Sequence, residues 1–342
     1  MSKTYIKIFG ACLLTLAGCS RDEVKDMLKG HEIDFMIAVD TRADEVTTDN
    51  IGSFFVTAID GIGATYFSDV EFSDEDGDNY FTSDSRFYWP ASGSLDFFAY
   101  SPGAQEMGAA VSIDKTSQIM TGFTTASSIA DQVDFITAKA EGSKEENADG
   151  VALEFAHQLS QIEIRAKNDN SGYVYKVKGV KIAKVASRGD FDFATETWGN
   201  ITDKVNYVTE YDSEITLSNT AESIMGDSGN AMVIPQDLNG WASDTDKTNE
   251  SEGSYIAVKI NVKTSSGMNV FPKGTVSEYG WVAIPVSNTW KPGIRYIYTL
   301  DFTTGAGKID PEDPATPGEE GEDVMGNTIK FSMDTHVIGW TN

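Results

Sequence analysis

The sequence predicts an all-β protein built from two antiparallel β-sandwich domains. Short runs rich in aromatic and β-branched residues follow one another along the chain, and turn residues such as Asp-Gly and Ser-Gly separate them. No long segment shows the apolar period of a helix. Many short strands at this spacing are typical of antiparallel sandwiches. With 342 residues, 40% of them hydrophobic, the chain is long enough for two cores.

Residues 1–18 have the pattern of a lipoprotein signal peptide. Lys3 and Lys7 precede an apolar run that is too short to cross a bilayer. The run ends in a tetrad that is similar to a bacterial lipobox, Leu16-Ala17-Gly18-Cys19. We therefore expect cleavage between Gly18 and Cys19 and lipidation of the Cys19 thiol. Several acyl chains, at about 0.8 kcal/mol per buried CH₂, would anchor the chain stably. The alternative is an ordinary secretory signal with a chance cysteine.

Composition excludes several classes of function. The second cysteine, Cys12, leaves with the signal peptide, so the folded part has no thiol for a disulfide, a nucleophile or a metal site. The formal charge is -27 and the isoelectric point is about 4.3. Removing residues 1–18 takes away two lysines and no acid, which leaves a charge of about -29. Nucleic acid would repel such a chain, so we exclude nucleic acid as a partner.

The strand pattern begins after a polar tether at residues 19–31. Apolar side chains alternate from Ile33 to Val39 within the first expected strand, Glu32–Asp40, which is the period of a half-buried strand. The further expected strands are Ser53–Ile59, Arg86–Trp89, Leu95–Tyr100, Val133–Ala138, Val151–Ala166, Tyr173–Val185, Tyr255–Lys263, Trp281–Val286 and Ile294–Phe302.

The domain boundary is expected near residue 148. Residues 141–150 form the most polar ten-residue stretch before the tail, so we assign an N-terminal sandwich to 32–148 and a C-terminal sandwich to 149–304. A long hairpin loop at 141–150 is the alternative.

The tail predicts a linker followed by one strand. Residues 305–327 are rich in proline, glycine and acids, and we expect them to be extended or disordered. In the last segment, residues 328–342, the apolar residues alternate again at Ile329, Phe331, Met333 and Val337. An isolated apolar strand behind a linker needs a groove, which makes it a candidate donor strand for another subunit. The alternative is a last strand that folds onto its own domain.

Nothing in the sequence predicts an enzyme, a cofactor or a metal site. Of the three histidines, His31 lies in the tether, His157 in an apolar stripe that favours a core role, and His336 on a solvated face. The acidic run Asp74–Asp78 is faintly similar to a calcium loop, but it lacks the glycine and glutamate that an EF-hand needs. A solvated hairpin tip is the better interpretation.

Motifs along the whole chain carry a resemblance to a known family. They occur in a fixed order: the lipobox, Thr41-Arg42-Ala43, Tyr88-Trp89-Pro90, Leu95-Asp96-Phe97-Phe98-Ala99-Tyr100-Ser101-Pro102, Asp134-Phe135-Ile136-Thr137-Ala138, Leu153-Glu154-Phe155-Ala156-His157-Gln158-Leu159-Ser160, Val233-Ile234-Pro235-Gln236 and Trp290-Lys291-Pro292-Gly293-Ile294-Arg295-Tyr296-Ile297-Tyr298. In order and spacing they resemble the fimbrillin-like lipoproteins, the type V pilus subunits of Bacteroidetes.

This resemblance implies two transthyretin-like β-sandwich domains and assembly by strand exchange. A lipoprotein precursor would reach the outer membrane at the cell surface, where an arginine-specific protease would cut between Arg42 and Ala43. Loss of the first strand would open a groove, and a strand of another subunit, of the same or a different kind, would fill it. An ordinary loop arginine is the alternative for Arg42.

We therefore expect a structural subunit of a fimbria, with a stalk role favoured. The alternatives are an anchor or tip subunit, or a surface glycan-binding lipoprotein. A glycan-binding protein would present exposed tryptophans on a platform, and the six tryptophans here are scattered.

Overall fold

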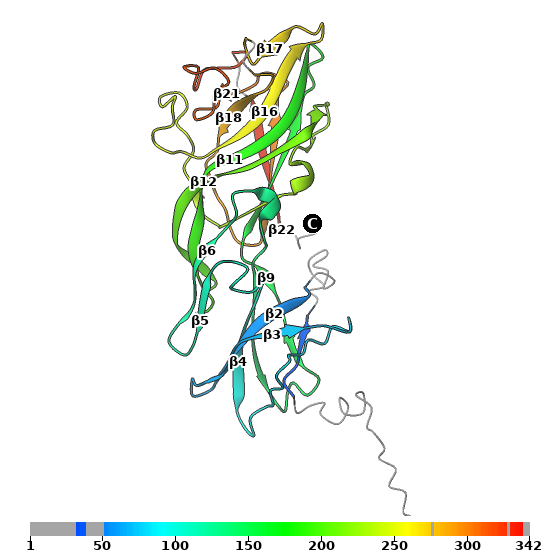
Figure 1. Cartoon of the computed structure of the whole chain (residues 1–342), viewed down its shortest axis with the longest axis vertical. Helices are drawn as coiled ribbons and strands as arrows, with labels where there is room; N and C mark the ends of the chain where they lie inside the picture. Colours follow the sequence, from blue (N-terminus) through cyan, green and yellow to red (C-terminus); the bar gives the residue numbers. More distant parts are fainter. Residues whose placement is uncertain (1–31, 39–50, 275–276, 327–328, 338–342) are drawn as a thin grey trace, which may run out of the picture.

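The computed structural model describes residues 32–38, 51–274, 277–326 and 329–337. The molecule is elongated, with two lobes stacked along its long axis (Figure 1). In these residues all regular elements are strands, apart from two short 3-10 turns at Ile129–Asp131 and Gly226–Ser228. No helix in this part of the chain is long and apolar enough to span a bilayer.

The N-terminal lobe packs a five-stranded sheet against a pair of short strands. The sheet order is β3-β2-β4-β7-β9 and the facing pair is β1-β8. Side chains of both layers form one core, because alternate residues of each strand point inward. The bounds are β1 Phe35–Ile37, β2 Ser53–Asp60, β3 Thr65–Ser73, β4 Ser94–Ser101, β7 Ile136–Ser143, β8 Val151–Leu153 and β9 Ala156–His157.

The C-terminal lobe packs two larger sheets. One has the order β21-β18-β16-β11-β6-β5, with β12 on β11 and β17 on β16; the other has the order β13-β10-β20-β22, with β14 on β10. A small pair, β15-β19, stands apart. The bounds are β5 Ala110–Ile113, β6 Gln118–Thr124, β10 Ser160–Lys167, β11 Tyr173–Asp192, β12 Thr197–Thr216, β13 Glu222–Ser223, β14 Ala231–Val233, β15 Asp237–Leu238, β16 Tyr255–Thr264, β17 Asn269–Phe271, β18 Gly280–Pro285, β19 Asn288–Thr289, β20 Ile294–Asp301, β21 Lys308–Ile309 and β22 Lys330–Val337.

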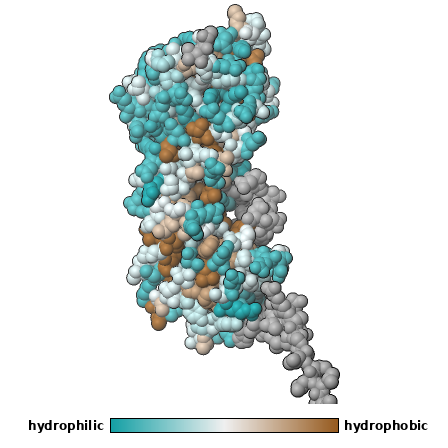
Figure 2. Space-filling model, viewed as in Figure 1, coloured by the Kyte–Doolittle hydropathy of each residue, from teal (hydrophilic) through white to brown (hydrophobic). Residues whose placement is uncertain are grey.

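The two lobes are joined by shared structure. Strands β5 and β6 come from the N-terminal half of the chain, but β6 pairs with the long strand β11 of the other half and β5 pairs with β6. Behind them lies a core cluster with members from both halves, among them Tyr100, Phe135, Phe191 and Ile234. The hydropathy surface has hydrophilic atoms over most of the upper lobe and more apolar atoms toward the junction and the lower lobe (Figure 2).

The predicted all-β sandwich class is confirmed, but two pairings are parallel. Strand β1 pairs with β8, and β10 pairs with β20, in the parallel direction, whereas the sequence predicts antiparallel sheets. Alternation of side chains fixes which face of a strand is buried, but it carries no information about the direction of the neighbour.

The strands divide differently from the sequence-based assignment. The run expected as one strand at 151–166 is three strands, and its first two, β8 and β9, complete the N-terminal lobe. The polar stretch 141–150 therefore covers the end of β7 and its connection to β8 within that lobe, and β8 pairs with β1 rather than with β7, so the stretch is not a hairpin loop. The expected strand Arg86–Trp89 makes only an isolated bridge, between Tyr88 and Glu32. The number of domains stays a prediction.

Candidate strand-exchange interface

Strand β1 lies inside the N-terminal lobe. Ile33, Phe35 and Ile37 are 1%, 0% and 4% exposed, as their alternation predicts. The ring of Phe35 meets the rings of Phe72 and Phe97 edge-on, with centroids 4.7 and 5.1 Å away. These contacts make the strand part of the core rather than a cover over it, although it is only three residues long.

Backbone hydrogen bonds hold β1 on both sides. On one side, the amide of Val151 donates to the carbonyl of Asp34 at 2.9 Å, and the amide of Ala38 donates to that of Leu153 at 2.9 Å. On the other side, the amide of Phe81 donates to the carbonyl of Phe35 at 2.9 Å. Removal of β1 would therefore leave unpaired groups on two neighbours, which would be a template for another strand.

Asn79 adds a side-chain bond that sequence reasoning missed. Its Nδ2 donates to the carbonyl of Ile37 at 3.2 Å, and its Oδ1 accepts from the amide of Ile37 at 3.3 Å. The side chain thus substitutes for a neighbouring strand at the end of β1. The backbone of Asn79 is left-handed, at φ 62°, which asparagine tolerates better than most residues. We call the cavity that β1 fills, between β8, residues 79–88 and the rings of Phe72 and Phe97, the β1 groove.

Several of the predicted site residues lie outside the described residues. These are the lipobox residues Gly18 and Cys19, and the expected cleavage residues Arg42 and Ala43. The segment with Arg42 joins the end of β1 to the start of β2 in the chain. These assignments stay predictions.

Strand β22 lies at the edge of the C-terminal lobe of its own chain. It pairs antiparallel with β20 from Lys330 opposite Asp301 to Val337 opposite Ile294, and among the described residues no further strand follows it in the sheet order. This arrangement matches the alternative in which the last strand folds onto its own domain. It describes a single copy of the chain and leaves the donor role a prediction.

The apolar face of β22 is only half covered. Ile329, just before the strand, is 7% exposed, but Phe331 and Met333 are 41% and 38% exposed. The rings of Phe331 and Tyr298 are stacked, with their centroids 5.4 Å apart. The sulfur of Met333 accepts a hydrogen bond from Nδ2 of Asn288 at 3.0 Å. His336 is exposed, as predicted. Separation of β22 from β20 would therefore uncover less apolar surface than separation of β1 from its lobe.

The tail segment, which we define as residues 305–324, is not the free linker that the sequence predicts. Ala306, Ile309 and Val324 are at most 4% exposed, and β21 pairs with β18. The amide of Val324 donates to the carbonyl of Gly307 at 2.9 Å and closes the segment into a loop. The prediction was wrong because a few apolar residues, spread among prolines and acids, find pockets that composition does not reveal.

A buried ion pair holds this segment. Lys181 on β11 lies 2.7 Å from Asp310, and the two side chains are 6% and 0% exposed. The hydroxyl of Tyr255 on β16 donates to Asp310 at 3.1 Å and to Glu312 at 3.2 Å. Such a pair must stay together, because one buried charge without its partner costs about 3–5 kcal/mol.

Glu312 adds a second link from the tail segment to the sheet. Its carboxylate lies 2.6 Å from Lys184 and accepts from Asn206 at 3.0 Å. Burial alone would raise the pKa of Glu312, but the hydrogen bonds from Lys184 and Asn206 outweigh burial and lower it. The carboxylate is therefore ionised at neutral pH and anchors the segment that precedes β22.

Two further groups that the sequence analysis weighed as candidate sites, His157 and the acidic run that begins at Asp74, have hydrogen-bond partners within the fold. His157 Nδ1 lies 2.5 Å from the carboxylate of Asp134, which fits the expected packing role. The carboxylate of Asp74 accepts from the amides of Gly77, Asp78 and Asn79 within its own turn. In the parts of the chain that the structure covers, no group of three or more acidic, histidine or cysteine residues is arranged to hold a metal ion.

The tryptophans do not form an exposed platform in the described residues. Four are buried, and Trp198 is half-buried against the ring of Phe123. Trp340 lies outside the described residues. The four buried tryptophans are Trp89, Trp241, Trp281 and Trp290.

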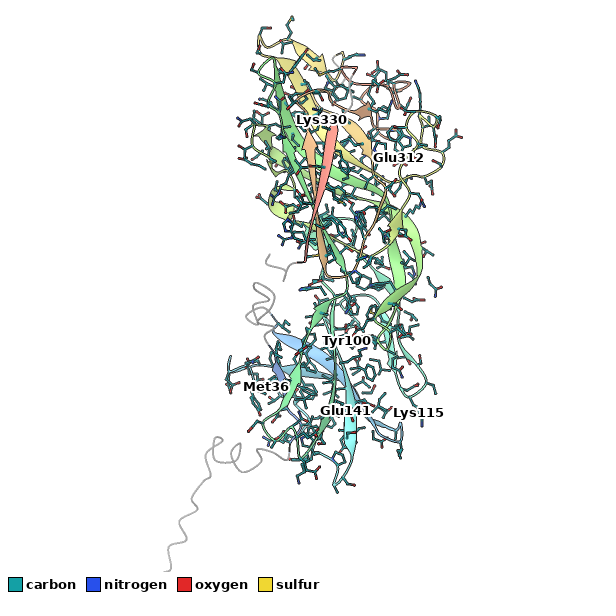
Figure 3. The ribbon with its side chains drawn as sticks, turned by 180° about the vertical axis from the view of Figure 1, so that it is seen from behind. Met36, Tyr100, Lys115, Glu141, Glu312 and Lys330 are labelled. Carbon is teal, nitrogen blue, oxygen red and sulfur yellow. The ribbon has the colours of Figure 1, made fainter. Side chains whose placement is uncertain are left out.

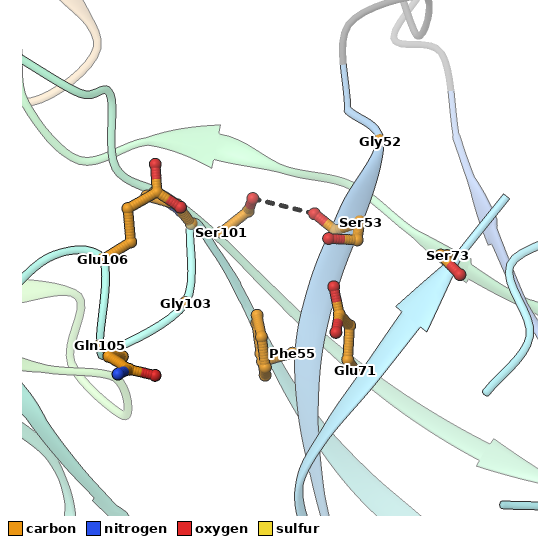
Figure 4. Close-up of a pocket in the computed structure, with 10 residues that line it drawn as sticks. Gly52, Ser53, Phe55, Glu71, Ser73, Ser101, Gly103, Gln105 and Glu106 are labelled. Carbon is orange, nitrogen blue, oxygen red and sulfur yellow. Dashed lines mark hydrogen bonds between the residues drawn. The ribbon is translucent and has the colours of Figure 1, made fainter. Parts of the chain in front are cut away.

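An open hollow of about 810 Å³ lies where β2 begins (Figure 4). Ser53 and Phe55 of β2 line it together with Glu71 of β3 and Glu106 of the loop after β4, and the hydroxyl of Ser101 donates to the carbonyl of Ser53 at 3.0 Å. The described residues that line it include three serines and two glutamates, and no histidine or cysteine is among them.

Comparison with known protein families identifies the family of the chain. The model of the fimbrillin-like family matches residues 39–313, which is most of the sequence. The chain therefore belongs to the fimbrillin-like family, as its motifs indicate. No curated protein matches it.

Solved structures resemble the chain at low sequence identity and with TM-scores below 0.5. A protein from Bacteroides uniformis assigned to cell adhesion is 14% identical, with a TM-score of 0.45, over 89% of this chain and 97% of the other. A second, from Parabacteroides distasonis, is 13% identical, with a TM-score of 0.49, over 89% and 95%. The fimbrial anchor protein Mfa2 from Porphyromonas gingivalis is 12% identical, with a TM-score of 0.34, over 79% and 90%.

Proposed function

We propose that this chain is a structural subunit of a cell-surface fimbria and assembles by protease-activated strand exchange. The observation that carries the proposal is β1: a three-residue strand whose inward side chains are almost fully buried. Cleavage after Arg42 would detach this strand from the rest of the chain. The strand of another subunit would then fill the β1 groove and restore the core.

The positions of groove and donor support an open polymer. Met36 of β1 lies in the lower lobe and Lys330 of β22 in the upper lobe (Figure 3). A surface on one lobe that binds a different surface on the other lobe of the next copy makes a head-to-tail contact, which generates filaments when it does not close into a ring.

The incomplete burial of β22 in its own lobe supports its transfer into the β1 groove of another subunit. Phe331 and Met333 are about 40% exposed in their own lobe, and a side chain of this size gains roughly 1.5–3 kcal/mol when it is fully buried. Because the tail segment is anchored up to Val324, only four residues, 325–328, separate it from Ile329 in the chain. At about 3.3 Å per extended residue this is roughly 13 Å, so the next subunit must lie close to the upper lobe.

Within the fimbria we favour a stalk role. A stalk subunit needs both a removable first strand and a donor strand, and this chain has candidates for both. The precursor would be an outer-membrane lipoprotein anchored through Cys19 and released from its lipid by cleavage between Arg42 and Ala43. An anchor subunit would keep the lipid, and a tip subunit would often lack the donor strand. No catalytic role is proposed.

Truncation after Gly326 tests the proposal. The truncated chain, cut after Arg42, should remain folded but form no SDS-resistant ladder and no fibres in electron micrographs. A full-length Ser332→Ala variant, altered on the opposite face of β22, is the matched control and should polymerise. Normal ladders from the truncated chain would refute the donor role of β22. A large loss of monomer stability on truncation would instead support a strand that belongs to its own lobe.

A further inference from the structure

We infer that Lys181 and Asp310 are the site of an intramolecular amide bond, which forms between the amine of the lysine and the carboxyl group of the aspartate with release of one water molecule. The bond would join the long strand β11 to the tail segment. The inference goes beyond the proposed function and does not depend on it, because it concerns the chemistry of a single folded chain.

The two groups are in contact and closed off from water. Nζ of Lys181 lies 2.7 Å from Oδ2 of Asp310, and the side chains are 6% and 0% exposed. The neighbouring pair of Lys184 and Glu312 is similarly close, at 2.6 Å, but its side chains are 18% and 28% exposed. Of these two pairs, only the first therefore places an amine against a carboxyl group in a site from which water is excluded.

Small side chains leave room for Lys181 to reach the tail segment. Lys181 on β11 lies opposite Ala257 on β16, and Ala257 lies opposite Ala283 on β18. Ala283 in turn lies opposite Lys308 of β21, two residues before Asp310 in the chain. Directly opposite residues share one face of a sheet, so two alanines occupy the positions between the lysine and the strand that leads to its partner.

The surroundings of Lys181 are poor in groups that stabilise a charge. Besides Asp310, its Nζ meets the ring of Trp281, with 4.8 Å to the ring centroid, and Trp281 is itself buried. An ammonium group carries three N–H donors, and a buried charge is costly unless it is fully hydrogen-bonded. Transfer of one proton to the carboxylate removes both charges and leaves an uncharged amine, which is a nucleophile.

The two oxygens of Asp310 are held differently. Oδ1 accepts from the amides of Glu312 and Asp313 at 2.9 and 3.1 Å, and from the hydroxyl of Tyr255 at 3.1 Å. Oδ2 faces Lys181, but within the part of the chain that the structure describes it accepts no bond at hydrogen-bond angles. Three donors on one oxygen stabilise negative charge as it develops there, and the oxygen beside the amine is the one that can leave.

The hydroxyl of Tyr255 keeps its proton for this role. It lies between the carboxylates of Asp310 and Glu312, and the residue is almost fully buried. Burial first, and then the charges of these two carboxylates, raise the pKa of Tyr255. The hydroxyl is therefore protonated at neutral pH and remains a donor to Oδ1. Glu312, labelled in the upper lobe in Figure 3, positions it.

The groups present balance the condensation. A proton moves from Nζ of Lys181 to Oδ2 of Asp310, and the electron pair of Nζ attacks Cγ. Negative charge passes to Oδ1, where the two amides and the hydroxyl stabilise it. A second proton moves from the nitrogen to Oδ2, the bond between Cγ and Oδ2 breaks, and water leaves. The three hydrogens of the ammonium end in one amide N–H and one water molecule, so no further reactant is needed.

The fold supplies what this reaction lacks in solution. A free amine and a free carboxyl group must first meet, and water reverses their condensation. Groups held in reactive contact behave as if present at roughly 10⁵–10⁸ M, and a closed site excludes the water that would hydrolyse the product. The bond would fix the segment that precedes β22 to β11, a strand within the larger sheet.

Peptide mass mapping of the purified full chain tests the inference. After denaturation, trypsin releases residues 179–181, 182–184 and 309–330 as separate peptides if the chain is unlinked. Trypsin does not cut after a linked Lys181, so a linked chain gives residues 179–184 joined to 309–330, lighter by one water molecule than the two peptides together. We expect this product, with loss of free 309–330. Recovery of 309–330 in free form from the folded chain would overturn the inference.

Lys181→Arg is the matched control. The guanidinium group keeps the positive charge but cannot be deprotonated in a protein, so it cannot attack Cγ, and free 309–330 should be recovered. A linked form of 309–330 in this variant would mean that another amine is joined, which would overturn the assignment of Lys181. The result for the unsubstituted chain decides the inference even if the variant fails to fold.

Tyr255→Phe tests the part played by the hydroxyl. It removes one of the three donors to Oδ1 and keeps the ring. The linked product, measured in samples taken at intervals after synthesis, should appear about 10²- to 10³-fold more slowly than in the unsubstituted chain. An unchanged rate would overturn the role of Tyr255, although linked peptides from the unsubstituted chain would still establish the bond.

Discussion

Replacement of Phe35 by alanine is the strongest perturbation that the N-terminal lobe offers. The side chain is fully buried and touches the rings of Phe72 and Phe97, and truncation of a buried phenylalanine costs about 3–5 kcal/mol. Phe331→Ala removes the same atoms from a side chain that is 41% exposed. Full burial of phenylalanine contributes roughly 1.5–3 kcal/mol, so the partial burial of Phe331 corresponds to about 1–2 kcal/mol.

Denaturant unfolding of the uncleaved monomers checks this difference, with hydrogen exchange to locate the loss. Phe35→Ala should increase exchange in β2, β4 and β8, and Phe331→Ala only in β20 and β22. In cleaved chains the order should reverse, because Phe331 would then fill the groove and Phe35 would be absent from it. A cost below 1 kcal/mol for Phe35→Ala would refute the reasoning that β1 is a core strand. Equal effects of both variants on polymer yield would refute the exchange of one ring for the other.

Four further predictions concern the tail segment and the N-terminal region. Lys181→Ala should destabilise the monomer by about 3–5 kcal/mol, measured by denaturant unfolding, because Asp310 stays buried without its partner; a loss below 1 kcal/mol would contradict the buried pair. Because the pKa of Glu312 is lowered in the fold, its contribution is present above the ordinary value of 4.5 and is lost as pH falls through the lowered pKa, so hydrogen exchange in residues 308–324 should rise as the pH falls below 4.5. Cys19→Ala should abolish incorporation of labelled palmitate, and unchanged labelling would exclude Cys19 as the lipid site. N-terminal sequencing of sheared surface material should give Ala43 if Arg42 is the cleavage site, whereas lipidated Cys19 would indicate an anchor or an unpolymerised lipoprotein.

The sequence predicts the local features of this protein well. The row Ile33, Phe35 and Ile37 is buried where its alternation indicates, and Phe331 and Met333 belong to the predicted strand β22. The order of motifs also leads to the family that the comparison establishes. These features can be read from sequence because the two-residue period of a strand is a local property of the chain.

Pairing direction and packing of the tail segment were decided only by the tertiary structure. The burial of Asp310 against Lys181 and the parallel pairing of β1 with β8 join residues far apart in the chain, and no local pattern encodes the identity of a distant neighbour. The acidic, proline-rich composition of residues 305–324 correctly indicates that they form little regular structure. Pockets contributed by β11, β16 and β18 nevertheless hold them in place, because a few buried apolar contacts and the ion pairs of Asp310 and Glu312 are sufficient to order a segment that has no strand pattern of its own.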